Sequence, residues 1–437
     1  MNKCRSDPRT IHARIIKCRP PDKAAYNGLI HHYSKSQLNK NLRQTYALRV
    51  FHVYLSRPTV VSWTCLISAL GDTHSSLTHF VSMLRYGTMP NQRTLAVLLK
   101  ACAALCTVSF GMQVHGVAHK MSLSTELFAG SALVNFYSKS GRSDDAWKLF
   151  GEMPERDPVS YSAVIVGLAQ NSQPVDALSC FADMVACGVP ATEYSVSAAL
   201  TSVGDMAVLE PCRILHGHAV VTGHYPNVVV GTSLLDAYGK CGLISEARQI
   251  FDELLPDMNL VGWNAMMSSY AQQGESKLVL DMFTSMNARG FTPDEYSFLA
   301  VLSCLQNAGL ADQAEGWLNE MKLKYGVEPQ IEHYTCVVGA LSGVGRLKEA
   351  VRVATSMPFE PDGAMWRTLL IACASHGDAD MAETASNRLL ELDPHDDSAY
   401  IILANILSNK GKLAEVAELR KKMKNSMIRR VVGRSWL

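Results

Sequence analysis

A chain of 437 residues exceeds the size at which one hydrophobic core keeps growing, so a single globule is not expected. Its composition, 48% hydrophobic and 19% charged, excludes a largely disordered chain. The best candidate for a membrane span, residues 94–105, is short and contains Lys100, so we expect no membrane-spanning helix and no membrane partner.

The formal net charge of +1 conceals an uneven distribution. Residues 1–19 carry six Lys or Arg and one Asp, and residues 420–437 carry seven Lys or Arg and no acidic residue. Of the 41 basic and 40 acidic residues in the chain, 28 basic and 39 acidic ones therefore lie in 20–419, a net charge of −11. A groove that neutralises phosphates should be basic, so a nucleic-acid function must be reconciled with this value.

The 12 cysteines lack the spacing of a metal site, since none forms a C-x-x-C pair. The closest two, Cys102 and Cys106, are one helical turn apart. Most cysteines lie inside apolar helical patterns, as in 101–103 and 372–374, where a free thiol behaves as a small hydrophobic group. We therefore expect buried, reduced thiols in a reducing compartment, with no metal and no cofactor.

A repeat of about 35 residues runs along the chain. The segment 130–141 (Gly-Ser-Ala-Leu-Val-Asn-Phe-Tyr-Ser-Lys-Ser-Gly) recurs at 231–242 as Gly-Thr-Ser-Leu-Leu-Asp-Ala-Tyr-Gly-Lys-Cys-Gly, with two further copies of the plan between them. Aligning these landmarks predicts units that begin near Lys23, Val60, Gln92, Leu127, Pro158, Glu193, Val228, Leu260, Glu295 and Ile331.

Each unit is predicted to form two helices joined by a short turn. Apolar residues recur at helical spacing in the first half, as in Leu133, Val134 and Tyr137. A glycine then supplies the left-handed conformation that ends the first helix, at Gly141, Gly242, Gly274, Gly309 and Gly345. Ser143 and Ser245 are placed to act as N-caps of the second helix.

The second helix carries a small residue followed one turn later by an aromatic residue. Alanine occupies one equivalent site in five units, at Ala146, Ala177, Ala247, Ala314 and Ala350. A small side chain lets the two helices approach closely, and the aromatic residue (Phe150, Phe181 or Phe251) should fill the core toward the next hairpin. Because a lone helical pair cannot bury its apolar stripe, the hairpins must stack into an all-α solenoid.

These repeats resemble the pentatricopeptide repeat family of land plants. Units that end as 290–294 does (Gly-x-x-Pro-Asp) look like its P type. Units with Leu-Lys-Ala-Cys (99–102) and Gln-Val-His (113–115) look like the long L type, and Met-Pro-Glu-Arg-Asp at 153–157 is typical of the short S type. The order P, L, S occurs three times from Val60 to Asp362, as in the PLS subclass, and implies a right-handed superhelical α-solenoid of helix-turn-helix repeats.

The C-terminal part is similar to the paired E motifs that close such arrays, on the strength of residues 366–373, 389–394 and 433–436. Tetratricopeptide repeats are the nearest alternative class and would fit the tail alone, but the alternating unit lengths and the Tyr-x-Lys-x-Gly turn argue against them for the array. The predicted organisation is a truncated L-type half repeat or import segment at 1–22, the repeat array at 23–362, a first E-type motif at 363–396 and a second one with a basic tail at 397–437.

The resemblance implies that two residues of each unit face single-stranded RNA and pair with one base, namely the fifth residue of the first helix and the last residue of the unit. Carried over to this sequence, the pairs are Thr64 with Asn91, Ser131 with Asp157, Ser162 with Thr192, Thr232 with Asn259, Asn264 with Asp294, and Thr335 with Asp362. A hydroxyl beside Asn suits adenine, a hydroxyl beside Asp suits guanine, and Asn beside Asp suits uracil. The L-type pairs are expected to read more weakly: Ala96/Glu126, Ser197/Asn227 and Leu299/Gln330.

The implied target is similar to 5′-A-x-G-R-x-A-U-x-G. Ordinary solvated polar side chains are the alternative interpretation of each pair. Because residues 20–419 are net acidic, affinity should come from base-edge hydrogen bonds and apolar sandwiching, with phosphate contacts limited to local patches and the basic tail. That tail is either a phosphate-binding segment or a solvated helix end, and its basic residues are Arg420, Lys421, Lys422, Lys424, Arg429, Arg430 and Arg434.

The sequence predicts no enzyme. Some arrays of the resembled subclass carry a cytidine deaminase, whose zinc-bound water requires H-x-E and P-C-x-x-C. None of the 14 histidines is followed two residues later by Glu, and Pro211-Cys212 lacks the second cysteine. His115 and His216 occupy matching L-type sites, which favours packing over metal ligation.

The leading hypothesis is therefore a sequence-specific factor for C-to-U editing of organellar RNA, which recruits a DYW-type deaminase or an editing cofactor protein in trans through the E-type tail. The alternatives are an RNA stability, processing or splicing factor that acts by occupancy, and a protein-interaction scaffold without RNA. No small-molecule substrate is expected. The resemblance places the protein in the mitochondrion, with the chloroplast as the alternative, and residues 1–19 are basic and acid-poor like an import signal.

Overall fold

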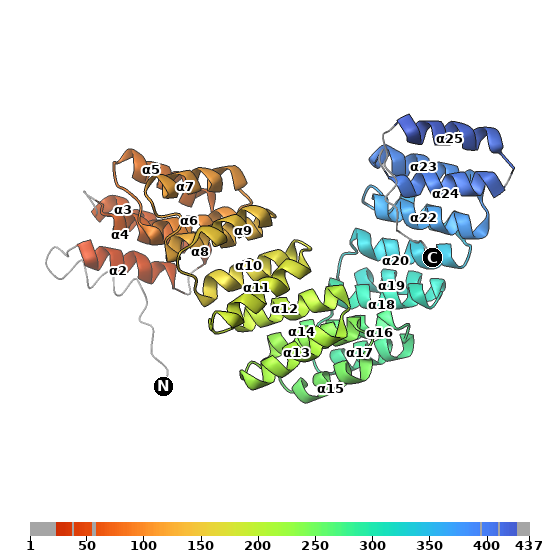
Figure 1. The fold of residues 1–437 in the computed structure, drawn as a ribbon, viewed down its shortest axis with the longest axis horizontal. Coiled ribbons are helices and arrows are strands. Elements are labelled where there is room, and N and C mark those ends of the chain that lie inside the picture. Colours follow the sequence, from red (N-terminus) through yellow and green to blue (C-terminus); the bar gives the residue numbers. More distant parts are fainter. Residues whose placement is uncertain (1–22, 37–38, 55–57, 394–395, 410, 426–437) are drawn as a thin grey trace. The chain divides into compact units, whose positions relative to one another are not determined.

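The computed structural model describes residues 23–36, 39–54, 58–393, 396–409 and 411–425. In these residues the regular structure is helical, with 24 helices, α2 to α25, that follow one another as hairpins (Figure 1). No helix in this part of the chain is long and apolar enough to cross a membrane. The predicted all-α class is confirmed, whereas the predicted half repeat or import segment at 1–22 lies outside the described residues.

The first helices of the hairpins are α2 (Lys23–Ser34), α4 (Val60–Leu70), α6 (Gln92–Ala104), α8 (Leu127–Lys139), α10 (Pro158–Gln170), α12 (Glu193–Met206), α14 (Val228–Lys240), α16 (Leu260–Gln272), α18 (Glu295–Asn307), α20 (Ile331–Gly343), α22 (Gly363–His376) and α24 (Asp397–Asn409). The second helices are α3 (Lys40–Tyr54), α5 (His74–Arg85), α7 (Val108–Lys120), α9 (Ser143–Glu152), α11 (Pro174–Ala186), α13 (Leu209–Val221), α15 (Ile244–Leu254), α17 (Ser276–Ala288), α19 (Ala311–Leu323), α21 (Leu347–Ser356), α23 (Ala379–Leu392) and α25 (Leu413–Asn425). All ten predicted unit starts coincide with the first residue of a first helix.

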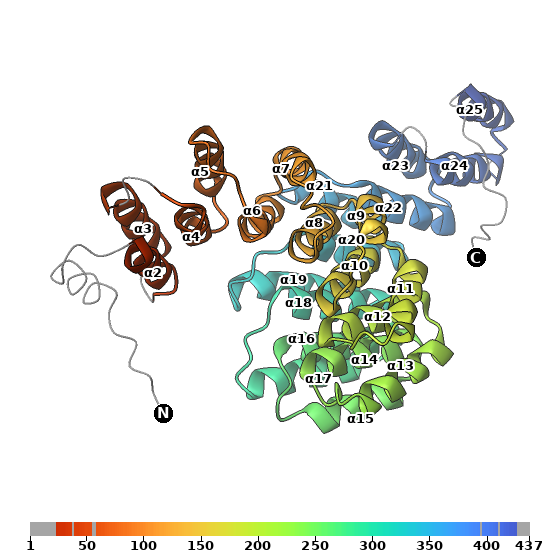
Figure 2. The same cartoon turned by 60° about the vertical axis from the view of Figure 1, so that its left-hand side comes forward.

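The chain forms two compact units, divided between Ser233 and Leu234 inside α14. In the first unit the first helices pack side by side, α4 on α6, α6 on α8 and α8 on α10, with α5 and α7 on one side of that row (Figure 2). In the second unit α16, α18, α20 and α22 form a corresponding row. Within each of these two rows, a first helix therefore contacts both its own second helix and the first helix that follows it.

In the turn between the two helices of a hairpin, the predicted glycines are confirmed and the predicted N-caps are wrong. Gly141 and Gly242 have φ of 71° and 80°, the left-handed conformation expected of them. Ser143, however, is the first residue of α9, and Ser245 lies inside α15, so neither is an N-cap. The residues before these helices, Arg142 and Leu243, have ψ of 60° and 69° and make no side-chain cap, because only this one residue separates the turn glycine from the second helix.

The small and aromatic sites of the second helices pack as the sequence predicts. The five alanines are at most 2% exposed. In the first unit the ring of Phe150 lies 4.9 Å from that of Tyr161 in the next hairpin, and in the second unit Phe251 lies 4.9 Å from Trp263. Aromatic rings therefore join successive hairpins edge to face, a favoured geometry for such pairs.

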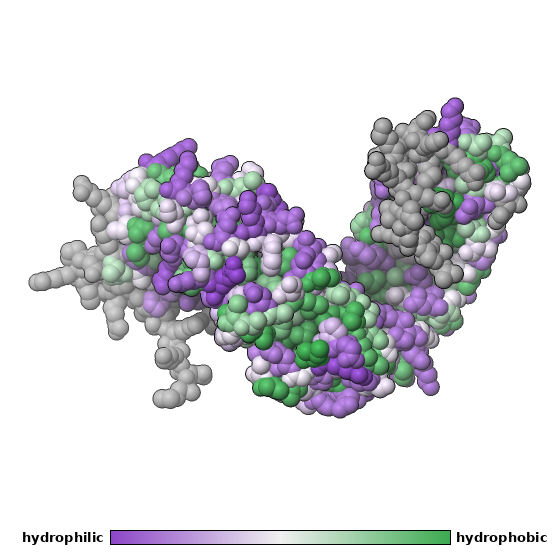
Figure 3. All heavy atoms as spheres, in the orientation of Figure 1, coloured by the Kyte–Doolittle hydropathy of each residue, from purple (hydrophilic) through white to green (hydrophobic). Residues whose placement is uncertain are grey.

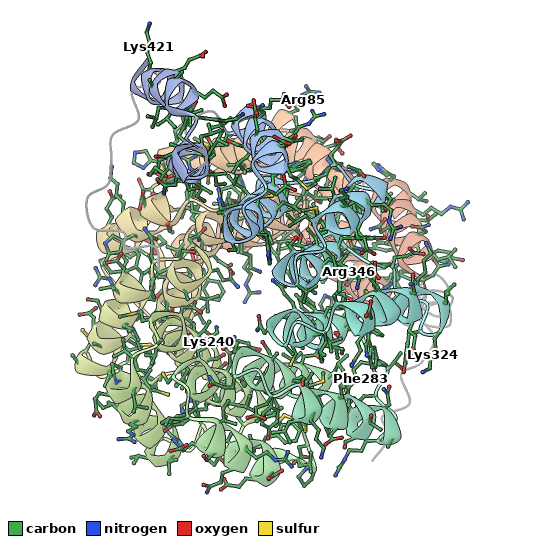
Figure 4. All side chains as sticks on the ribbon, turned by 90° about the vertical axis from the view of Figure 1, so that its right-hand side faces the viewer. Arg85, Lys240, Phe283, Lys324, Arg346 and Lys421 are labelled. Carbon is green, nitrogen blue, oxygen red and sulfur yellow. The ribbon has the colours of Figure 1, made fainter. Side chains whose placement is uncertain are left out.

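A larger aromatic cluster lies between the hairpins α16–α17 and α18–α19. Phe283 of α17, labelled in Figure 4, packs against Trp317 of α19 with ring centroids 5.0 Å apart and against Phe298 of α18 at 5.4 Å. Tyr325, which follows α19, closes the cluster at 5.2 Å from Phe298. The core of the second unit is thus continuous across the boundary between these two repeats.

The outer surface of the first unit is not uniform. Hydrophilic residues cover much of the surface over α5 to α9, whereas a hydrophobic area lies over α11 and α12 (Figure 3). Val175 and Val185 of α11 are 64% and 43% exposed.

Candidate nucleic-acid interface

The last residue of each predicted unit is the N-cap of the next first helix. Asp157 Oδ1 accepts a hydrogen bond from Ser160 N at 2.8 Å, and Asp362 Oδ1 accepts one from Met365 N at 2.9 Å. An N-cap oxygen satisfies one of the helical N–H groups that have no partner inside the helix. The residues that cap in this way are Asn91, Asp157, Thr192, Asn259, Asp294 and Asp362. Capping uses one polar atom of each side chain and fixes that side chain in place.

The fifth residue lies one turn further along the same first helix. Where it is Ser or Thr, its hydroxyl contacts the carbonyl oxygen four residues earlier, as in Ser131 Oγ to Leu127 O at 2.6 Å and Thr335 Oγ1 to Ile331 O at 2.9 Å. In Ser131 and Thr335 this bond uses the hydroxyl proton and leaves the oxygen lone pairs as acceptors.

The structure brings three of the six predicted pairs together through hydrogen bonds. Asn264 Nδ2 donates to Asp294 Oδ1 at 2.9 Å, and the hydroxyls of Ser162 and Thr192 lie 2.7 Å apart. Thr64 and Asn91 are connected through the hydroxyl of a third residue, Thr94.

Two of the other three pairs, Ser131 with Asp157 and Thr335 with Asp362, have no direct hydrogen bond between their described side chains. Ser131 and Asp157 line the same hollow, about 480 Å³ in volume. Thr335 lies on α20, and Asp362 caps α22 in the same unit. Thr232 lies on α14 in the first unit, and Asn259 caps α16 in the second, so these two residues are described separately.

The L-type positions differ from these pairs. Ser197 Oγ lies 2.6 Å from Ser233 Oγ, and Asn227 Nδ2 donates to Glu193 Oε2 at 2.7 Å. Both side chains are therefore bonded to residues other than each other. The weaker reading expected of the L-type pairs stays a prediction.

The second residue of the first helices was not singled out from the sequence, although it shares the surface of the pairs. Most of these residues are apolar or aromatic and yet exposed: Val61 (51%), Phe128 (61%), Val159 (62%), Tyr194 (60%), Val229 (43%), Val261 (63%) and Tyr296 (63%). They lie off the buried stripe, which uses the third, fourth, seventh and eighth residues, as Ala129, Gly130, Leu133 and Val134 illustrate. An apolar residue outside that stripe was the signal that could have identified them.

Hollows on this surface combine the pairs with the exposed apolar residues. The hollow that contains Ser131 and Asp157 is also lined by Phe128, Val159 and Lys139. A second hollow of about 780 Å³ is lined by Ser162, Thr192, Tyr194 and the same Val159 and Lys139. Both hollows offer an aromatic ring, the two polar side chains of a predicted pair and at least one lysine, which are groups that can bind a nucleotide base and its phosphate.

The negative net charge of the array does not lie on the first helices. The 12 first helices carry as many basic as acidic residues, namely Lys23, Arg93, Lys100, Lys139, Lys240 and Arg367 against Glu193, Asp205, Asp236, Glu295, Glu332 and Asp397. The net charge of −11 for 20–419 therefore resides on the second helices and the connecting segments, the capping carboxylates included. The first helices themselves are therefore neutral, whereas the capping residues Asp157, Asp294 and Asp362 add negative charge beside the pairs.

The C-terminal helices are held by a partly buried ion pair. Asp396, only 4% exposed, caps α24 through Ala399 N at 3.1 Å and pairs with Arg367 of α22. Burial alone would raise the pKa of the Asp396 carboxyl, but hydrogen bonds from Arg367, Ser398 and the Ala399 N–H outweigh it and hold that pKa below its usual value.

The basic tail is described only in part. Lys421 is exposed and points away from α25 (Figure 4). The side chains of Arg420, Lys422, Lys424, Arg429, Arg430 and Arg434 lie outside the described residues. Phosphate binding by this tail therefore stays a prediction.

The histidine and cysteine side chains take structural roles. His115 Nδ1 lies 2.8 Å from the Tyr137 hydroxyl, which supports the packing interpretation, and burial lowers the pKa of this imidazole. Burial raises the pKa of the Cys102 thiol to about 11 and that of Cys180 to about 12. Cys106 and Cys187 are exceptions to the expected burial, since both are exposed. Among the described residues, no group of three or more His, Cys, Asp or Glu could hold a metal ion.

The chain is thus a helical-repeat protein, in which helical hairpins stack and the polar residues that end the units cap the first helices. Models of the PPR repeat match residues 131–157, 159–189, 232–255 and 296–325, and a PPR repeat family model matches 258–307. A model of the E motif matches 376–437. Together with the relatives below, these matches show that the chain belongs to the pentatricopeptide repeat family.

Several relatives are proteins of Arabidopsis thaliana. A putative mitochondrial pentatricopeptide repeat-containing protein is 32% identical over 99% of this chain and 68% of its own length. A second pentatricopeptide repeat-containing protein is 32% identical over 99% of this chain and 72% of its own length. Other relatives are longer, and this chain spans 43% and 47% of the length of two of them.

A solved structure has the same fold. The pentatricopeptide repeat protein PPR10, crystallised with an 18-nucleotide psaJ RNA element, matches with a TM-score of 0.69 over 95% of this chain and 62% of that chain. The sequences are 20% identical, so this likeness concerns the arrangement of the helices.

Proposed function

We propose that this protein is a sequence-specific single-stranded RNA-binding factor of a plant organelle, which specifies a C-to-U editing site and recruits a deaminase in trans through its E motif. The observation that carries the proposal is the series of polar pairs along the first helices, most of which lie beside an exposed apolar or aromatic residue. The pairs supply hydrogen-bond donors and acceptors for base edges, and the apolar residues supply surfaces on which bases stack.

The donor and acceptor groups of the pairs support the base assignments. At Asn264 and Asp294, one Nδ2 proton and the oxygen Oδ2 form no hydrogen bond with any described residue, so the pair offers one donor beside one acceptor. Uracil presents a carbonyl acceptor beside its N3–H donor, which complements this pattern. At Thr64 and Asn91 the hydroxyl oxygen accepts and the Asn91 amide donates, which complements the N1 acceptor and the N6 donor of adenine.

The E motif and the relatives support the remaining parts of the proposal. In the pentatricopeptide repeat resemblance, E motifs close arrays that specify editing sites, and the motif here spans 376–437. The deaminase or editing cofactor protein would bind this tail. The relative whose name places it in the mitochondrion supports a mitochondrial location, with the chloroplast as the alternative.

The proposal is tested by sequencing organellar transcripts from plants that lack the protein. Loss of a single C-to-U event, downstream of a sequence similar to 5′-A-x-G-R-x-A-U-x-G, is the expected result. Altered transcript ends with intact editing would instead indicate a factor that acts by occupying its RNA. Unchanged transcripts would contradict both and favour a scaffold that binds proteins through its acidic second helices.

A further inference from the structure

Two base-reading pairs share a feature that the pairs themselves do not explain. The third residue of the following first helix carries a hydroxyl that reaches both members of the pair. Ser297 reaches Asn264 and Asp294 in the second unit, and Thr94 reaches Thr64 and Asn91 in the first. We propose that these two hydroxyls fix the orientation of the donors and acceptors of their pairs and so set the base preference there. The inference rests on the proposed function of the pairs as base readers.

Ser297 determines the orientation of the Asn264 amide. Its hydroxyl donates to Asn264 Oδ1 at 2.7 Å and lies 2.9 Å from Asp294 Oδ1, which also accepts Asn264 Nδ2 at 2.9 Å. The amide oxygen is therefore turned toward Ser297 and the amide nitrogen toward the carboxylate. A flipped amide would set its oxygen against that carboxylate and lose the hydroxyl bond, so the donor stays available to the base.

Without the Ser297 hydroxyl, the amide oxygen loses its only donor among the described residues. The amide can then turn toward the ligand and accept a hydrogen bond from an exocyclic amino group, such as that of cytosine. Removal of the hydroxyl should therefore weaken the discrimination of uracil from cytosine more than it weakens binding.

Thr94 plays the corresponding part in the first unit. Its Oγ1 donates to Asn91 Oδ1 at 2.9 Å, and its backbone N donates to the same oxygen at 2.9 Å. Both bonds turn the Asn91 amide nitrogen outward as a donor. Because the Thr94 proton goes to Asn91 Oδ1, the Thr64 hydroxyl donates to Thr94 Oγ1 over 2.7 Å and keeps its own oxygen as an acceptor. The same side chain therefore orients both members of an adenine-reading pair.

Ser297 and Thr94 act through the pairs and not through contact with RNA, because both are 0% exposed. Ser160 provides a contrast at the same position of another repeat, and it is also 0% exposed. Its hydroxyl contacts only the backbone N and O of Asp157, each at 2.9 Å, and neither side chain of the pair Ser131 and Asp157. Ser160 thus shares the capping role without the orienting role.

The test compares Ser297→Ala with Ser160→Ala in the full chain, with Ser297→Thr as the conservative variant, since Thr94 shows a threonine at this position. Dissociation constants are measured by fluorescence anisotropy at one salt concentration. The probes are 5′-A-A-G-A-A-A-U-A-G RNA and the same RNA with cytosine at the seventh base. Circular dichroism establishes that each variant is folded.

The expected result is that Ser297→Ala lowers the uracil-over-cytosine ratio by about five-fold, which corresponds to a hydrogen bond of about 1 kcal/mol. Ser160→Ala should leave this ratio unchanged, and Ser297→Thr should retain it. A folded Ser297→Ala chain with the wild-type ratio would overturn the role of Ser297 alone. A wild-type chain that binds both probes equally would overturn the reading of uracil by Asn264 and Asp294 as well.

Discussion

Replacing Asn91 by Asp should convert an adenine-reading position into a guanine-reading one without unfolding the repeat. Asn91 Oδ1 caps α6 by accepting from Thr94 N and Thr94 Oγ1, both at 2.9 Å. A carboxylate keeps that oxygen, and a negative charge at a helix N-terminus is favourable. The substitution changes only the second polar atom, from an amide nitrogen that donates to an oxygen that accepts.

The size of the effect follows from that one atom. Adenine N1 accepts hydrogen bonds, so it would face a carboxylate oxygen instead of a donor, whereas guanine N1 carries a proton and gains an acceptor. A matched bidentate pair discriminates between bases by about 1–3 kcal/mol, or roughly 5- to 150-fold. The Asn91→Asp chain should therefore prefer guanine over adenine at the first base by a factor in this range.

The assay is a gel shift or anisotropy titration at one salt concentration, with RNA probes that differ only at the first base. Asn91→Ala is the control, because it loses both the cap, at about 1 kcal/mol of folding stability, and the readout. A retained adenine preference in the folded Asn91→Asp chain would refute the pairing of Thr64 with Asn91. Equal weakening for all four bases would instead indicate repulsion between the new carboxylate and the RNA backbone.

Three further outcomes are expected. Tyr296→Ala should weaken RNA binding by about 1–3 kcal/mol in titrations while leaving the uracil-over-cytosine ratio unchanged, because the 63%-exposed ring offers stacking and no base-edge bond; a changed ratio with unchanged affinity would contradict this. In α7, Gly111→Ala should lower the unfolding free energy by about 1–3 kcal/mol, since a Cβ there would lie 2.1 Å from Phe136 Cζ. Gly116→Ala in the same helix, with nothing within 4 Å of its Cβ, should raise the unfolding free energy by about 0.5–1 kcal/mol. Urea denaturation measures both changes, and a change of the same sign in both variants would refute the close contact between Gly111 and Phe136. Arg367→Ala should cost about 2 kcal/mol by leaving the buried Asp396 carboxylate without its cation. The pKa of Asp396 is lower in the folded than in the unfolded chain, so the stability that its carboxylate contributes is present above the unfolded pKa and is lost as pH falls through the folded pKa. Arg367→Ala should move this loss of stability to higher pH in acid-unfolding curves. An acid transition at the wild-type pH would contradict the pairing of Arg367 with Asp396.

The repeat boundaries could be predicted from the sequence because several independent signals agree on them. The turn glycines, the buried alanines and the aromatic residue one turn later all recur, and the predicted starts match the first residues of the first helices, from Lys23 to Ile331. The fifth and last positions came from the family resemblance. The last position also has a physical signal in the sequence, because Asn, Asp and Thr are preferred N-caps and Ser160, Ser195 and Ser297 follow at the third residue of the helix.

Other features required coordinates. The second helices begin directly after the residue that follows the turn glycine, so the N-cap preference of Ser143 was overridden by backbone geometry. The exposure of Phe128 and Tyr296 depends on which stripe of the helix faces the neighbouring hairpins. The neutrality of the first helices became visible only once first and second helices had been distinguished, because the net charge of a segment says nothing about its faces. Hydrogen bonds between successive units, such as Ser297 to Asn264, join residues 33 positions apart.

The most direct test of base reading by the polar pairs is selection of bound RNA from a random single-stranded pool by the purified chain, followed by sequencing. Enrichment of 5′-A-x-G-R-x-A-U-x-G is expected, with adenine fixed at the first base and uracil at the seventh. Recovery of RNA without an enriched motif, or with a motif whose first and seventh bases differ from these, would contradict it.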